Sequence, residues 1–246
     1  MRLISAPLAL ALASLLSACS PFLDKVLDGP HPPPSHVTRT ECLALAEAYR
    51  VHRWTPVAAN VKHGDDSKGI RIDTPDITHN PGGKIPGWYV PGQETEGVPY
   101  QWGGFCTIEE FDAGVAAHKA AGDVYTDAKR AKLDDAVSTE AVGIDCSGFI
   151  SRLWKLPRSY STRELPGLCK PVKWEAMQPG DILNTHNAHC LLFAGWNDPQ
   201  HERIIAYETG CPPSWRVLSH SIDVKWLQGL GYRPWRYRGM REGSGK

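Results

Sequence analysis

The stretch that most constrains this 246-residue chain is residues 143–154, with the sequence GIDCSGFISRLW. Cys146 follows an acidic residue, and Phe149, Ile150 and Leu153 come after it at helical spacing, which predicts a buried helix with Cys146 in its first turn. Unpaired N–H groups and the dipole at a helix N-terminus favour negative charge, so this position lowers a thiol pKa. The same stretch equally fits an inert cysteine, because free cysteine is among the most buried residue types.

A histidine, His189, opens the apolar run HCLLFAGW further along the chain. The length of the run, its β-compatible residues and the turn that follows predict a strand beginning at or near His189. Residues 203–207 return as a second strand that ends at Glu208. If this hairpin lies beside the helix of Cys146, the imidazole can take the thiol proton and a side chain of the neighbouring strand can orient the ring. A lone histidine at such a position is more often structural.

Together these residues resemble the NlpC/P60 cell-wall peptidases, a papain-like group of cysteine hydrolases. Residues 145–149 (Asp-Cys-Ser-Gly-Phe) are similar to the nucleophile motif of that family, and residues 99–104 (Pro-Tyr-Gln-Trp-Gly-Gly) to its upstream motif. A Pro-Gly-Asp turn at 179–181 stands before His189, as it does before the base histidine of the family. The resemblance covers residues 98–210. It implies an α+β, papain-like fold, in which the nucleophile begins a helix packed on an antiparallel sheet.

The resemblance also implies roles for single residues. Cys146 corresponds to the nucleophile, His189 to the base, and Tyr100 to a residue beside the nucleophile that can assist the backbone N–H of Cys146 at the oxyanion. The third catalytic position, commonly His and sometimes Asn or Gln, is taken here by Glu208, whose carboxylate can still accept the second ring N–H. His201, in the turn, is the weaker candidate for that position. The expected substrate-binding residues are Trp102, Asp145 and Ser147.

The activity that the resemblance implies is hydrolysis of an amide bond in a peptidoglycan stem peptide, often between D-glutamate and a diamino acid. The reaction passes through a thioester and needs no metal or organic cofactor. Two other functions stay open. One is a thiol amidase or transacylase acting on another acyl substrate, and the other is a non-catalytic, envelope-binding lipoprotein. We expect a monomer.

The chain departs from the family between its two motifs, where residues 105–142 form an insertion. Ile108, Phe111 and Val115 keep helical spacing, and residues 127–139 predict a second helix. Because the flanking motifs should meet in space, we expect the insertion beside the cleft, as a lid or a specificity wall. A purely structural excursion on the far side is the alternative.

The first residues of the chain predict export. One basic residue, an apolar run over residues 3–16 and small residues after it are typical of a secretory signal, since a spanning helix needs about 20 apolar residues. Residues 16–19 (Leu-Ser-Ala-Cys) resemble a bacterial lipobox, which implies removal of residues 1–18 and acylation of Cys19 as a membrane anchor. An ordinary signal peptide is the alternative. Ser20 resembles the outer-membrane sorting pattern, so we expect a location in the cell envelope, facing the periplasm.

The rest of the chain predicts one domain behind a tether. Residues 19–40 are rich in proline and predict an extended tether, residues 41–240 the catalytic domain, and residues 241–246 a frayed tail. The 27 basic and 27 acidic residues balance without long blocks of either sign, which argues against a nucleic-acid partner.

Coarse secondary structure follows from local signals. A helix capped by Thr38 or Thr40 is predicted to run to about Trp54, and Gly and Pro predict loops with at most one hairpin over residues 57–93. Residues 217–238 predict a short helix and a last strand that closes the sheet. In the loop region, solvated polar side chains are a better interpretation than metal ligands for His63, Asp65, Asp66, Asp73, Asp76 and His79.

Seven cysteines add a further constraint. Beyond Cys19 and Cys146 five remain, and in an exported protein some of them should pair. Cys190, next to His189 on a buried strand, is the one we expect to stay free. A disulfide at Cys146 would remove the nucleophile. The residues expected to form disulfides, with no readable connectivity, are Cys42, Cys106, Cys169 and Cys211.

Overall fold

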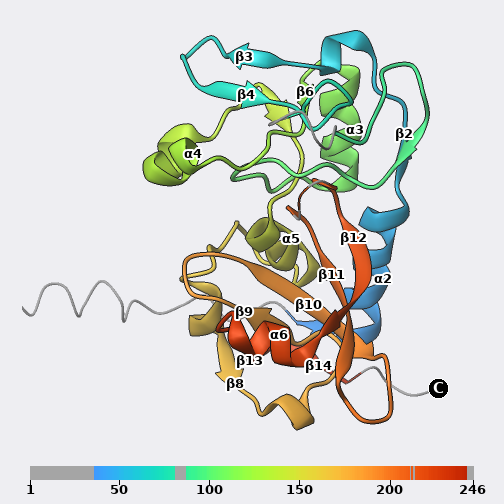
Figure 1. Ribbon diagram of the computed structural model, residues 1–246, viewed down its shortest axis with the longest axis vertical. Helices are drawn as coiled ribbons and strands as arrows, with labels where there is room; N and C mark the ends of the chain where they lie inside the picture. Colours follow the sequence, from blue (N-terminus) through green and yellow to red (C-terminus); the bar gives the residue numbers. More distant parts are fainter. Residues whose placement is uncertain (1–35, 81–86, 211, 213, 243–246) are drawn as a thin grey trace, which may run out of the picture. The chain divides into compact units, whose positions relative to one another are not determined.

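The computed structural model describes residues 36–80, 87–210, 212 and 214–242 (Figure 1). The chain divides into two units, Met1–Pro33 and Pro34–Lys246, and the described residues all belong to the second. The predicted signal sequence, Cys19 and most of the predicted tether therefore lie outside the described residues. Within the described part, no helix has both the length and the apolar composition needed to cross a membrane.

Six strands form one antiparallel sheet in the order β12-β11-β10-β9-β13-β8. β10 and β11 form the predicted hairpin, with an irregularity between Phe193 and Gly195. β10 begins at Cys190, so His189 immediately precedes the strand. Helices pack against this antiparallel sheet, which confirms the α+β class. The strands are β8 (Cys169–Pro171), β9 (Ile182–Asn184), β10 (Cys190–Trp196), β11 (Arg203–Glu208), β12 (Leu218–Asp223) and β13 (Arg233–Tyr237).

The two faces of the sheet carry separate cores, because successive side chains of a strand point to opposite faces. In β10, Cys190 and Leu192 belong to one core, whereas Leu191 and Phe193 belong to the other. Helix α5 (Cys146–Leu153) lies in the first core, where it packs against β10 and against α2 (Figure 1). Helix α6 (Val224–Gly229) contributes Leu227 to the second core.

Helix α2 (Arg39–Val51) starts where the sequence places one of two possible caps. The Thr38 hydroxyl accepts the N–H of Glu41, and the Glu41 carboxylate accepts the N–H of Thr38, which is a complete capping box. The helix ends at Val51, earlier than predicted, because His52 takes an extended backbone conformation and Trp54 lies in a short strand.

Both ends of the folded domain lie further out than the sequence predicts. Strand β1 (Val37–Thr38) pairs in parallel with β14 (Met240–Arg241). Val37 is buried, so the domain begins inside the stretch predicted as tether, and Arg241 belongs to a strand and not to a frayed tail. This pairing ties the start of the domain to its end, which a local pattern cannot reveal.

The C-terminal part contains the predicted helix, α6, and the predicted strand, β13. However, β13 does not close the sheet, because it lies between β9 and β8. Strand β12, which forms the opposite edge of the sheet beside β11, was not predicted. Its sequence is Leu-Ser-His-Ser-Ile-Asp, and Ile222 is its one buried residue. Apolar and polar residues therefore do not alternate clearly along this strand, so the usual signal for a strand is weak.

The insertion is helical, as predicted. Its first helix is α3 (Ile108–Ala116), capped by Thr107, and its second is α4 (Asp127–Lys132), continued by the 3-10 helix η3 (Leu133–Ala136). The second helical run is shorter than predicted because Leu133 has a φ of 51°, which interrupts the regular helix. Strands β6 (Ala120–Ala121) and β7 (Ala141–Val142) pair in parallel within the insertion.

The region predicted as loops contains the one hairpin allowed for it. The remaining short elements are β2 (Arg53–Trp54), which pairs with β5 (Thr95–Glu96); the hairpin of β3 (His63–Asp65) and β4 (Arg71–Asp73); and the 3-10 helices η1 (Ala58–Asn60), η4 (Leu165–Leu168) and η5 (Trp174–Ala176).

The prediction of disulfides is wrong for the cysteines that the structure describes. Cys42, Cys106 and Cys169 are buried free thiols, and Cys211 lies outside the described residues. All three belong to the first apolar core, where a thiol behaves as a small apolar group. Cys190 is free, as expected, and Cys146 is not in a disulfide.

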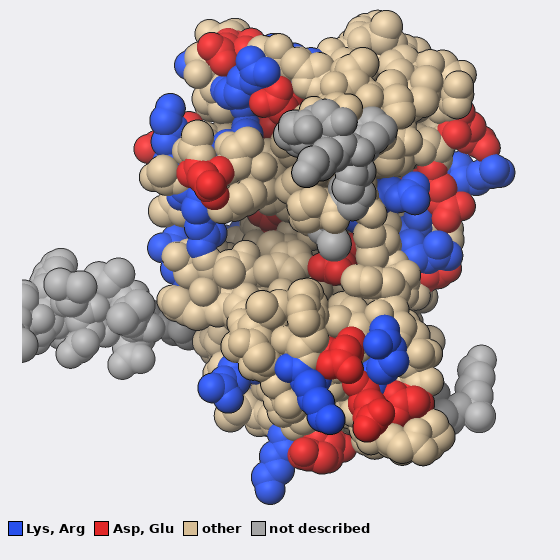
Figure 2. All heavy atoms as spheres, in the orientation of Figure 1, with Lys and Arg blue, Asp and Glu red and all other residues tan. Residues whose placement is uncertain are grey.

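Charges of both signs share the surface. On the face drawn in Figure 2, Lys and Arg side chains are interspersed with Asp and Glu side chains. This distribution matches the charge balance of the sequence.

Candidate active site

Helix α5 begins at Cys146, as the sequence predicts. The Asp145 side chain caps it by accepting the backbone N–H of Gly148, and it also accepts the Ser147 hydroxyl at 3.1 Å. Cys146 is only 9% exposed, but it lines a cleft. The thiol therefore lies at the positive end of a buried helix dipole and still faces a space that a ligand can enter.

The two motifs of the family resemblance lie against each other. Tyr100 and Phe105 both bridge to Ile144, just before the helix. A Cβ atom at Gly148 would come 2.1 Å from the carbonyl oxygen of Gly104, so the helix can lie this close only because Gly148 has no side chain. The two motifs therefore lie together although the insertion separates them in the sequence.

The hairpin brings the predicted base and its partner to the thiol. The His189 ring interacts with the Cys146 sulfur through charge and hydrogen bonding, and its Nε2 lies 2.7 Å from Oε2 of Glu208. Since Nε2 contacts the carboxylate, Nδ1 is the ring nitrogen left for the sulfur. Glu208 is the last residue of β11 and is 6% exposed, so the pairing of β10 with β11 brings both side chains to the same place.

A second histidine, His220, contacts the other oxygen of the same carboxylate. Its Nε2 hydrogen-bonds Oε1 of Glu208, and the residue lies on β12, where it pairs with Ala206. His220 was not predicted, because its strand was not predicted; a polar stretch with a histidine beside a predicted hairpin was the one available signal. His201 takes no part, because its ring stacks on Trp196 with 4.1 Å between ring centroids.

The electrostatics of these groups favour charge separation. A hydrogen bond from the Cys190 thiol and the charge of His189 hold the pKa of Cys146 well below its usual value, although burial opposes this. Burial alone would lower the pKa of His189, but the Cys146 thiolate and Glu208 raise it to about 10. Burial would likewise raise the pKa of Glu208, yet hydrogen bonds from His189 and His220 lower it to about 2. The three shifts therefore favour a thiolate at Cys146, an imidazolium at His189 and a carboxylate at Glu208.

The cleft has a volume of about 370 Å³ and contains most of the predicted site residues. Its lining includes Tyr100, Trp102, Asp145 and Ser147, together with Cys146 and His189. Glu208 does not line it and contacts His189 from the protein side.

Tyr100 is positioned by tight packing. A Cβ atom at Gly210 would come 2.8 Å from a ring carbon of Tyr100, so the ring occupies the space of a side chain there. The Tyr100 ring also packs on Trp215. Burial raises the Tyr100 pKa well above its ordinary value, so the phenol stays protonated and can donate a hydrogen bond.

Comparisons with protein-family models, with curated proteins and with solved structures found no match for this chain. Among the described residues, no three His, Cys, Asp or Glu side chains are grouped so that they could hold a metal ion.

Proposed function

We propose that this protein is a cysteine hydrolase with a papain-like, NlpC/P60-type fold, which cleaves an amide bond of a peptidoglycan stem peptide. The observation that carries the proposal is that Cys146 and His189 line one cleft while Glu208 contacts His189 from the protein side. Two further features support it, namely the matching motifs in family order and a nucleophile at the start of a helix packed on an antiparallel sheet.

In the first step, the Cys146 thiolate attacks the carbonyl carbon of the scissile amide. The developing oxyanion receives hydrogen bonds from the backbone N–H of Cys146 and from the Tyr100 hydroxyl; one such donor typically contributes about 3 kcal/mol. The C–N bond then breaks as the His189 imidazolium gives its proton to the leaving amine. A thioester at Cys146 and a neutral His189 remain.

In the second step, His189 takes a proton from water, and the hydroxide formed attacks the thioester carbonyl. The C–S bond breaks, the acid product leaves, and the thiolate and imidazolium are restored. Glu208 stabilises the imidazolium and fixes which nitrogen faces the sulfur, while His220 holds the carboxylate in place.

The test is cleavage of purified muropeptides followed by mass spectrometry. The protein should release a stem-peptide fragment with a new free carboxyl group, and Cys146→Ala should abolish its release. Cys169→Ala is the matched control, since Cys169 is another buried thiol but does not line the cleft, and it should retain activity. Equal cleavage by Cys146→Ala would refute the proposal, and a product joined to an added amine would identify transfer instead of hydrolysis.

We also propose that the activity is held in the cell envelope, facing the periplasm, by a lipid anchor at Cys19. The lipobox-like residues before Cys19 support this placement. Cys19→Ser should release the protein from the membrane fraction, and continued retention would contradict the anchor.

A further inference from the structure

The insertion supplies one wall of the cleft. Arg130 comes from α4, Leu133 and Asp134 from η3, and Val137 follows directly, and all four line the cleft that contains Cys146. This is the position of a specificity wall. The first insertion helix, α3, does not line the cleft and packs against β6 and β7.

This wall is attached firmly to the upstream motif. The indole N–H of Trp102 donates to the carbonyl of Leu133 at 3.1 Å, and the Trp102 ring packs on Tyr125 with 5.6 Å between centroids. Gly103 has a φ of 68°, and a Cβ atom there would come 2.4 Å from a methyl group of Val137. The insertion therefore lies in close contact with the motif and presents a defined surface to the cleft.

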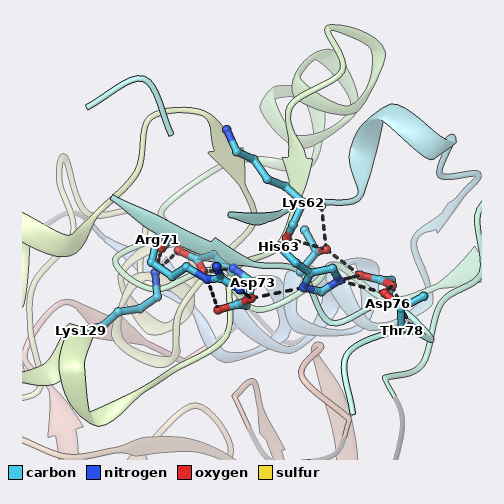
Figure 3. A network of polar contacts seen from close by, with 9 residues as sticks. Lys62, His63, Arg71, Asp73, Asp76, Thr78 and Lys129 are labelled. Carbon is cyan, nitrogen blue, oxygen red and sulfur yellow. Dashed lines mark hydrogen bonds and ion pairs between the residues drawn. The ribbon is translucent and has the colours of Figure 1, made fainter. Parts of the chain in front are cut away.

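A buried ion pair fixes the orientation of α4 itself. Lys129 is 3% exposed, and its ammonium group lies 2.6 Å from Asp123. The same group also donates to the carbonyl of Arg71 (Figure 3). Asp123 accepts the backbone N–H of Asp73 at 3.0 Å as well. Breaking a buried pair of this kind leaves an uncompensated charge, so the face of α4 that carries Lys129 is held against the β3–β4 hairpin.

The polar network continues along that hairpin. His63 lies between Asp73 and Asp76, with Nε2 to Oδ2 of Asp76 at 2.9 Å, and Arg71 pairs with Asp73 at 2.7 Å (Figure 3). The charge of Arg71 is therefore paired with that of Asp73. The charge available to a ligand lies elsewhere on α4.

Arg130, the next residue after Lys129, lines the cleft, and its side chain makes no hydrogen bond or ion pair with any residue that the structure describes. The same holds for Arg163, which reaches the cleft from the loop between α5 and η4. By contrast, Arg39, Arg50 and Arg236 all pair with carboxylates. Two arginines whose guanidinium groups have no partner among the described residues thus line the cleft that contains the nucleophile.

The acidic residues of the cleft do not neutralise both arginines. Asp145 accepts hydrogen bonds from Gly148 and Ser147 at the helix start, and Asp134 is a single exposed carboxylate. A guanidinium group binds a carboxylate with two parallel hydrogen bonds, which makes it a better match for a planar anion than for a neutral amide.

We propose that Arg130 and Arg163 bind a free carboxylate next to the scissile amide, so that the insertion selects acidic substrates. The inference rests on the proposed function and deepens it. In a stem peptide cleaved after γ-linked D-glutamate, the group bound would be the α-carboxylate of that glutamate. An α-amide at the same position lacks the charge and the second acceptor oxygen.

The experiment compares two γ-D-glutamyl–diamino acid peptides that differ only in a free α-carboxyl group or an α-amide. The wild-type protein should cleave the free acid with the higher kcat/KM. Arg130→Gln should lower that kcat/KM by about tenfold or more, chiefly through KM, and should change cleavage of the amide little. Arg163→Gln should act in the same direction. Lys132→Gln is the control, because it removes a positive charge from the same helix outside the cleft.

Binding separates this inference from the proposed function. Cys146→Ala protein should bind the free acid more tightly than the amide, as measured by calorimetry, and adding Arg130→Gln should remove the difference. Preferential binding without cleavage by the wild type would support the arginines and refute the hydrolase. Cleavage of both peptides at equal rates, unchanged in Arg130→Gln, would overturn the role of the arginines and leave the hydrolase standing.

Discussion

The reactivity of each thiol in this protein depends on its surroundings. Burial raises the pKa of Cys42 and of Cys106 to about 12 in each case, because the lost hydration of a thiolate outweighs the opposing charge of Arg39 at Cys42 and of Arg152 at Cys106. Cys146 is also buried, yet its pKa shifts the other way, because the Cys190 thiol and His189 stabilise the negative sulfur. The difference is one of neighbours, since the residue type is the same.

Asp145 is the neighbour that opposes the thiolate. Loss of hydration and the charge of Cys146 raise the Asp145 pKa to about 7, so the two negative charges repel each other. Asparagine caps helices as well as aspartate does. Asp145→Asn should therefore keep α5 intact and lower the pKa of Cys146 further. Alkylation by iodoacetamide, followed against pH by mass spectrometry at Cys146, should show its midpoint at lower pH in the variant. A midpoint at higher pH would mean that the carboxyl group supports the thiolate.

Helix α5 reaches its position because of two glycines. Gly148 lies against the backbone of Gly104. A Cβ atom added at Gly104 would in turn overlap the backbone of Gly143. These contacts place the first turn of the helix against the upstream motif. The motif residues thus serve packing as well as chemistry, since the nucleophile depends on the close approach of two backbone segments.

Gly148→Ala should destabilise the protein, because its methyl group would overlap a backbone oxygen that cannot move freely. Overpacking of this kind typically costs about 1 to 3 kcal/mol, and the thiol should shift as well. Urea unfolding and the alkylation rate of Cys146 would measure both effects. Gly167→Ala is the control, because a Cβ atom at that glycine meets no neighbouring atom within 4 Å. Equal stability of the two variants would contradict the packing argument.

At the scale of the molecule, the ionisable side chains of the site come from four different parts of the fold. Cys146 comes from α5, His189 from the position just before β10, Glu208 from β11 and His220 from β12. Since the strands are neighbours in the sheet, their pairing holds the row together. The free energy of unfolding and the ionisation of these side chains are therefore linked.

This link predicts a pH dependence of stability. The Glu208 pKa falls from 4.5 to about 2 on folding, because hydrogen bonds from His189 and His220 outweigh the effect of burial. A lowered carboxyl pKa stabilises the folded state fully above the unfolded value, and this contribution is lost as pH falls from about 4.5 towards 2. The difference in unfolding free energy between wild type and Glu208→Gln should shrink across that window. His220→Ala should shift the loss to higher pH, and a difference independent of pH would contradict the ionic role of Glu208.

Much of the fold was predictable where a local pattern sufficed. The helix at Cys146 follows from apolar spacing over eight residues, the cap at Thr38 from a Thr and a Glu three positions apart, and the β10–β11 hairpin from two apolar runs around a turn. The expected site residues at Cys146 and His189 also meet in the structure. The helix, the cap and the hairpin depend on residues close together in the chain, whereas the meeting of Cys146 and His189 was expected from the family resemblance.

Long-range features were missed for a physical reason. Whether Cys42 can reach another thiol depends on where its helix packs, and the position of β13 inside the sheet depends on its pairing with β8 and β9. Strand β12 lies at the edge of the sheet, where solvent and side-chain hydrogen bonds can satisfy its polar groups. Apolar and polar residues therefore do not alternate clearly in its sequence. His220 was missed with it.

The sequence by itself determined which residues begin the buried helix, which form the hairpin and that the insertion is helical, because spacing, caps and turns act over a few residues. Only the tertiary structure decided that Glu208 lies between two histidines and that the five described cysteines are not joined to one another. It also decided that Arg130 faces the cleft while Lys129 is buried. Those outcomes depend on contacts between segments far apart in the chain, and such contacts form only when the whole core packs.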